Sequence, residues 1–163
     1  MNTTAYDLLM RHWDGSLPVD VESIARKLGI AVRSRFGMAG GESGCISRTE
    51  DDQYAIEYDA TQSRVRQRFT IAHELGHFAL GHLQPGQREF RDKPAHFMTA
   101  VDHPKERAAN AFAAKVLMPE DTLKAIIIDH NVTSLTALAN IFDVSRAAMT
   151  FRLKNLGVHI EEA

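Results

Sequence analysis

The spacing of apolar residues predicts two helices at the start of the chain. A helix over 4–13 is indicated by apolar residues that recur every three or four positions, namely Tyr6, Leu9, Met10 and Trp13. A second helix is expected over 19–28, with Gly29 placed as its C-terminal stop. Short strands are expected next, because apolar and polar positions alternate between glycine-rich or acidic turns, over 30–36, 45–47 and 54–58.

The rest of the chain is predicted to be mainly helical. Asp59 is expected to cap a long helix that runs to about Gly81. The stretch 84–104 has no clear period and is expected to be mostly irregular. Further helices are expected over 105–117, 120–129, 134–142 and 145–156. This order predicts an α+β fold with a small antiparallel sheet. We expect residues 1–131 to form one domain, with 132–163 as a helical segment packed on it.

Composition narrows the class of protein. The 163 residues carry a net charge of −2, which removes any case for a globally basic nucleic-acid binder. Cys45 is the only cysteine, so neither a disulfide framework nor a cysteine zinc cluster is expected. The first residues lack the pattern of a signal peptide, and no apolar stretch approaches a membrane span. We therefore expect a cytosolic protein with no membrane partner.

One segment of the predicted long helix carries metal-site chemistry. His73, Glu74 and His77 form a His-Glu-x-x-His pattern, for which this composition gives about 0.02 chance occurrences. Residues four apart lie on one helix face, so both imidazoles can bind one zinc ion. Glu74 flanks the metal and can act as general base toward a water there. Two unrelated helix histidines are the alternative, which the strongly helical context disfavours.

A catalytic zinc site needs a third protein ligand. The candidates downstream are His82, His96, His103 and Glu106, with Asp92 and Asp102 less well placed. Five residues after His77, His82 is rotated off the ligand face and is interpreted as a polar residue at a helix end. Glu106 is favoured because it opens a helix rich in small residues, which can pack closely against the zinc helix. Asn110, one turn later, is suited to hold a ligand histidine by a hydrogen bond. The alternative for Glu106 is an N-terminal helix acid favoured by the helix dipole.

Two motifs together resemble the ImmA/IrrE family of bacterial and phage metallopeptidases. They are RFTIAHELGHFALGH and ERAANAFAAKVLMP, preceded by PVDVESIARKLGI. The resemblance implies a gluzincin-like core in which His73, His77 and Glu106 bind one zinc ion. It also implies Glu74 as general base and Asn110 as a partner of a ligand. The sequence leaves open whether zinc or manganese is the working metal.

The resemblance also implies a substrate. Members of the family are associated with cleaving a helix-turn-helix repressor of the Xre/cI type, which derepresses its genes. A zinc endopeptidase acting on one such regulator is therefore expected. The alternatives are a non-proteolytic repressor-binding protein, a toxin-like partner of an Xre-type regulator, and a DNA-binding regulator. Intact Glu74 argues against the non-proteolytic forms, because a purely structural metal site needs no base.

The last two helices are patterned like a helix-turn-helix. Ser145 is expected to cap the second helix, with inward positions at Leu138, Ala139, Val144, Met149 and Leu153. The cations available for phosphates are Arg146, Arg152 and Lys154. Asp143, Glu161 and Glu162 offset much of this charge. Packing of these helices on the peptidase core is therefore favoured over DNA contact.

Overall fold

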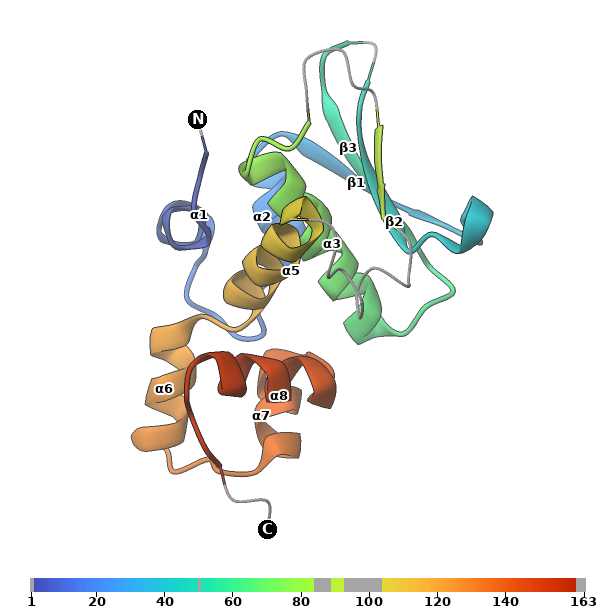
Figure 1. The fold of residues 1–163 in the computed structure, drawn as a ribbon. Coiled ribbons are helices and arrows are strands. Elements are labelled where there is room, and N and C mark those ends of the chain that lie inside the picture. The colour runs from blue at the N-terminus through green and yellow to red at the C-terminus, as the bar shows by residue number, and fades with distance from the viewer. Residues whose placement is uncertain (1, 50, 84–88, 93–103, 161–163) are drawn as a thin grey trace.

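A computed structural model describes residues 2–49, 51–83, 89–92 and 104–160 (Figure 1). Helix α1 spans Ala5–His12 and begins at a capping box between Thr4 and Asp7. Helix α2 spans Val21–Lys27 and is capped by Asp20. The predicted inner face of α1 is wrong in part: Tyr6 and Met10 are 65% and 69% exposed. Its buried residues are instead Ala5, Leu8 and Leu9.

The strands form one sheet in the order β1-β3-β2-β4. Their bounds are Ile30–Arg35 (β1), Gly44–Arg48 (β2), Tyr54–Asp59 (β3) and Glu89–Asp92 (β4). The hairpin of β2 and β3 is antiparallel, as is the β2–β4 pair, but β1 runs parallel to β3. The sheet is therefore mixed rather than wholly antiparallel. The connection 36–43, which contains the 3-10 turn η1 (Ala39–Gly41), is long enough to step past one strand position, and β3 fills that position.

Strand β4 lies within the stretch 84–104, which the sequence predicts to be mostly irregular. Within that stretch, 89–92 is a strand that pairs with β2 from Gly44↔Asp92 to Ser47↔Glu89. The remainder of the expected irregular stretch, at 84–88 and 93–103, lies outside the described residues. The two outer strands of the described sheet are thus β1 and β4.

Helix α3 (Arg64–Ala79) lies against the sheet, and α5 (Pro104–Leu117) packs beside it (Figure 1). Close approach to the sheet depends on Gly44 in β2. A Cβ there would lie 2.3 Å from Thr70 Cγ2 and 2.8 Å from the Glu57 carbonyl oxygen. The core between the sheet and these helices includes Ile46, Ile56, Leu75 and Phe112.

The C-terminal helices lie below this unit in Figure 1. They are α6 (Glu120–Ile128), α7 (Leu135–Phe142) and α8 (Arg146–Asn155). Ser145 caps α8, as predicted. The five inward positions expected in the pair are all buried and join the same core as Leu117 and Met118. In the described part of the chain, every helix is too short or too polar to span a bilayer.

Candidate metal centre

Helix α3 is capped by Ser63, whose hydroxyl accepts a hydrogen bond from the Arg66 amide. The expectation that Asp59 caps this helix is wrong. Asp59 ends β3, and its carboxylate accepts hydrogen bonds from the amide and hydroxyl of Thr61. An aspartate that accepts a hydrogen bond from the residue two positions later forms a turn. The Asp59 carboxylate is therefore engaged in this turn and does not cap the helix.

The second half of α3 presents two imidazoles to a carboxylate from α5. His73 Nε2 and His77 Nε2 are 3.0 Å apart. Glu106 places Oε2 3.1 Å from His73 Nε2 and Oε1 3.3 Å from His77 Nε2. All three side chains are buried. The three residues offer ligand atoms that lie within 4.8 Å of one another, so this group could hold a metal ion.

Small residues bring the carboxylate to the histidines. Gly76 faces α5, where a Cβ would lie 3.2 Å from each of Ala109 Cα, the Ala109 carbonyl oxygen and Phe112 Cβ. The two helix backbones therefore nearly touch one turn after Glu106. Glu106 itself lies in the first turn of α5, where the helix dipole favours a carboxylate.

Each imidazole has a polar group behind it. Asn110 Oδ1 lies 2.8 Å from His73 Nδ1. Because an amide oxygen only accepts, His73 Nδ1 carries the hydrogen. His82 Nδ1 lies 2.9 Å from His77 Nδ1. Sequence reasoning gave Asn110 this position but missed His82, although Gly81 was the signal that the chain reverses there.

The donor set fits a divalent cation. Burial lowers the pKa of His77 to about 4, so its imidazole is neutral near pH 7. His73 carries its hydrogen on Nδ1, so the Nε2 lone pair that would bind an ion points at a carboxylate oxygen of Glu106. Glu106 Oε2 is buried without a hydrogen-bond donor among the residues described. A cation placed between the two ring nitrogens and the Glu106 carboxylate would bind the lone pairs of all three groups. A tetrahedron with arms of about 2.0–2.1 Å has edges of about 3.3–3.4 Å, close to the separations here.

The remaining sequence candidates divide into two groups. Glu74 is fully buried on α3 and faces β2, with its Cγ 3.8 Å from the position of a Cβ on Gly44. His82 lies behind His77 and outside the group of ligand atoms. Three candidates, His96, Asp102 and His103, lie outside the described residues, as does the side chain of Asp92.

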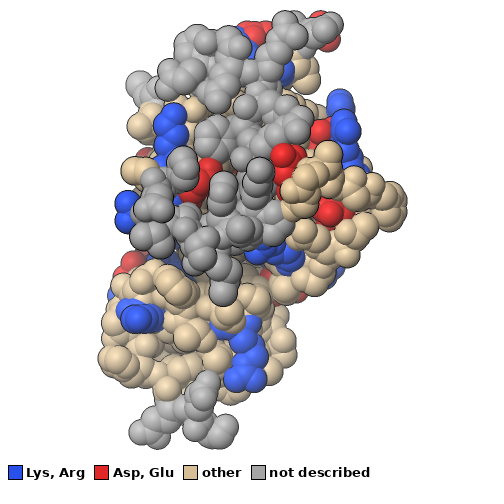
Figure 2. Space-filling view, turned by 45° about the vertical axis from the view of Figure 1, so that its right-hand side comes forward, with Lys and Arg blue, Asp and Glu red and all other residues tan. Residues whose placement is uncertain are grey.

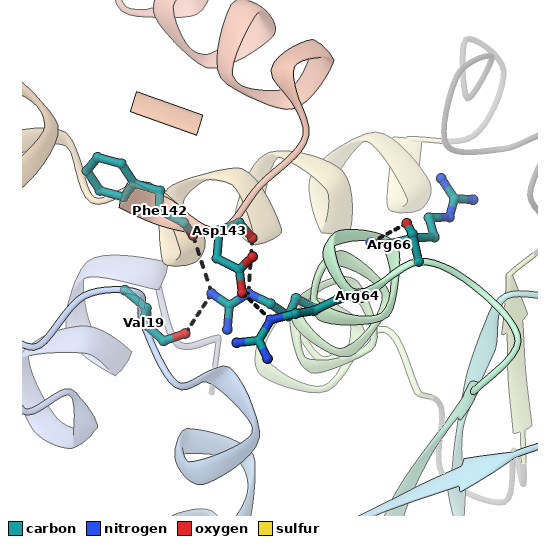
Figure 3. A network of polar contacts seen from close by, with 7 residues as sticks. Val19, Arg64, Arg66, Phe142 and Asp143 are labelled. Carbon is teal, nitrogen blue, oxygen red and sulfur yellow. Dashed lines mark hydrogen bonds and ion pairs between the residues drawn. The ribbon is translucent and has the colours of Figure 1, made fainter. Parts of the chain in front are cut away.

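The N-terminal half of α3 holds the C-terminal helices (Figure 3). Asp143, in the turn between α7 and α8, pairs with Arg64 at 2.6 Å and Arg68 at 3.3 Å. Arg68 also donates to the carbonyl oxygens of Asp143, Val19 and Phe142. Arg66 is turned away from this network. Arg64 and Arg68 thus tie α3 to the turn between α7 and α8, whereas Arg66 donates to the Ser43 hydroxyl at 3.2 Å.

The prediction that Arg152 is available to contact phosphates is wrong. Its side chain is buried, and its Nε donates to the Met118 carbonyl oxygen at 3.0 Å. Arg146 and Lys154 remain exposed on α8. On the face seen in Figure 2, Lys and Arg side chains over the C-terminal helices are separate rather than continuous. Phosphate affinity needs several basic contacts, and the burial of Arg152 removes one of the three predicted cations.

A mixed sheet with two helices that present a buried His-His-Glu group defines a protein of the His-Glu-x-x-His metal-site class. The sequence model of the IrrE N-terminal-like domain (Peptidase_M78) matches residues 25–154, which include the whole site. The chain therefore belongs to this family of metal-dependent peptidases. A search of curated proteins gives no significant match.

Proposed function

We propose that this protein is a zinc-dependent endopeptidase that cleaves a helix-turn-helix repressor of the Xre/cI type. One observation carries the enzymatic part: two imidazoles and a carboxylate converge in a buried group, with Glu74 one residue along the same helix. Membership of the peptidase family supports the reaction class. The choice of a repressor as substrate rests on the resemblance of the two motifs to ImmA/IrrE peptidases.

His73, His77 and Glu106 would hold the ion. Two nitrogen donors and one oxygen donor are a common set for catalytic zinc, which keeps a fourth position for water or substrate. When bound, zinc supplies a Lewis acid that polarises the scissile carbonyl and acidifies a water molecule. Manganese binds the same donor types, so the choice of zinc over manganese is itself proposed.

Glu74 would move the proton. Its side chain is fully buried, one residue along α3 from His73, and there it would take a proton from the attacking water and deliver it to the leaving amine. Asn110 holds His73 in the tautomer whose Nε2 lone pair would bind the ion. Gly44 allows α3 to approach the sheet closely enough to keep Glu74 enclosed.

The test is incubation of the purified protein and zinc with any Xre-type repressor found to be encoded beside its gene, with fragments identified by mass. We expect one or a few cleavage sites for the wild type and none for Glu74→Gln, which keeps the size of the side chain but cannot take the proton. Denatured casein serves as a non-cognate substrate and should remain intact.

Each other outcome has a distinct meaning. Cleavage by Glu74→Gln at the wild-type rate would refute the mechanism. If the wild type binds the repressor with zinc present and leaves it intact, the protein is a repressor-binding protein and not a peptidase. Casein degradation without repressor cleavage would keep the enzyme class and overturn the substrate.

A further inference from the structure

At the end of α3, the chain turns at Gly81 so that His82 lies against His77 of the candidate metal site. Gly81 has φ +69°, a left-handed conformation that favours glycine. Its amide donates to the Phe78 carbonyl oxygen at 3.1 Å, and the His82 amide donates to the His77 carbonyl oxygen at 2.9 Å. These two bonds form a Schellman motif, in which the second residue past the helix end lies over the third residue before it.

This motif normally closes with an apolar side-chain contact. Here the two positions are His82 and His77, and a contact between imidazoles takes its place. Their ring centroids are 5.1 Å apart with an interplanar angle of 60°, and the Nδ1 atoms are 2.9 Å apart. At that distance one nitrogen must carry a hydrogen and the other must accept it.

The contacts of His77 Nε2 determine which of the two Nδ1 atoms donates the hydrogen. His77 Nε2 faces His73 Nε2 and Glu106 Oε1, so a neutral His77 that binds an ion must keep its lone pair there. Its hydrogen is then on Nδ1, and His82 Nδ1 is the acceptor. His73 is held in the same way by Asn110 Oδ1. The two imidazoles are thus fixed from behind by acceptors from different parts of the chain.

We propose that His82 is a positioning residue that orients His77 toward the metal through this Nδ1–Nδ1 hydrogen bond, and that Gly81 delivers it there. The inference rests on the metal site of the proposed function. Acceptors behind a ligand histidine fix its tautomer and ring orientation, and their removal typically lowers metal affinity about 10–100-fold.

Two substitutions separate the hydrogen bond from simple packing. His82→Leu keeps a bulky side chain against His77 but offers no acceptor. His82→Asn places Oδ1 where the imidazole has Nδ1, so it keeps the acceptor. His159→Leu, at an exposed histidine far along the chain, is the matched control. The measurements are the zinc Kd, by competition with a chromophoric chelator, and the visible spectrum of the cobalt-loaded protein.

We expect His82→Leu to weaken zinc binding about 10–100-fold and to change the cobalt spectrum. His82→Asn should recover most of the affinity, and His159→Leu should bind as the wild type does. A wild-type Kd for His82→Leu would overturn the inference, as would an Asn variant as weak as the Leu variant. If the wild type itself takes up no zinc, the proposed function fails instead.

A measurement on the unmodified protein guards against a Leu variant that does not fold. In the zinc-loaded wild type labelled with ¹⁵N-histidine, long-range ¹H–¹⁵N spectra report which ring nitrogen carries the hydrogen. We expect His77 to be protonated on Nδ1 and His82 on Nε2. A His82 that carries its hydrogen on Nδ1 would contradict the proposed bond.

Discussion

Replacement of Gly76 by alanine tests how closely α3 and α5 must approach. The added Cβ would meet two backbone atoms of Ala109 and the Cβ of Phe112, each at 3.2 Å. Carbon atoms normally pack at about 3.5–4.0 Å, and no rotamer change moves a backbone atom, so the helices must separate by a few tenths of an ångström. Overpacking of this kind costs about 1–3 kcal/mol. Alanine in place of glycine contributes about 1 kcal/mol of helix propensity.

The net expectation is a loss of about 0–2 kcal/mol in the free energy of unfolding. For a chain of this size that lowers Tm by about 0–8 °C, measured by circular dichroism without metal. Glu106 moves with α5, so the zinc Kd should also rise. Ala111→Gly, exposed on α5, is the control that measures the helix-propensity contribution alone. A Gly76→Ala variant with a higher Tm and an unchanged zinc Kd would refute the close contact.

Three further predictions follow from other contacts. Gly44→Ala should lower Tm more than Gly76→Ala, because its Cβ would lie 2.3 Å from Thr70 Cγ2; a Tm equal to that of the wild type would contradict this approach of β2 to α3. Arg68→Ala should destabilise the protein by about 2–3 kcal/mol in denaturant titrations, since it removes the partner of Asp143 and the donor to the Asp143 and Phe142 carbonyl oxygens. Arg64→Ala should cost clearly less, because its guanidinium is 76% exposed. The metal-free protein should lose stability as pH falls from about 6.5 to 4, because burial lowers the pKa of His77 in the folded state and not in the unfolded state. The free energy of unfolding should fall by at most about 1.4 kcal/mol per pH unit. In His77→Gln this dependence on pH should be weaker.

The convergence of the two histidines and the glutamate could be predicted because its signals are local. A four-residue spacing on a helix and a run of small residues around Ala109 each depend on neighbours in sequence. The approach of α5 to α3 then follows from Gly76 and Ala109, which leave room for two backbones to meet. In the described part of the chain, His73, His77, Glu106 and Asn110 lie where those signals point.

The errors arose where a distant or competing contact decides the outcome. Periodicity placed Tyr6 and Met10 inside, but α1 docks with Leu8 and Leu9 inward, and the docking face depends on residues far along the chain. Asp59 has the chemistry of a cap, yet its bonds to Thr61 compete successfully for its carboxylate.

His82 and the sheet show the same limit. Helical geometry correctly removes His82 from the ligand face, but it holds only up to Leu80, after which Gly81 reverses the chain. The parallel pairing of β1 with β3 could not be inferred from alternation, because alternation identifies strands and not their neighbours.

The most direct test of the account is a zinc titration of three proteins by calorimetry: the wild type, Glu74→Gln and Glu106→Gln. We expect one zinc per chain for the wild type and for Glu74→Gln, with similar Kd values, and much weaker binding to Glu106→Gln because a ligand is lost. Zinc binding by Glu106→Gln with the wild-type Kd would contradict the three-ligand site, and loss of zinc by Glu74→Gln would show that Glu74 is itself a ligand.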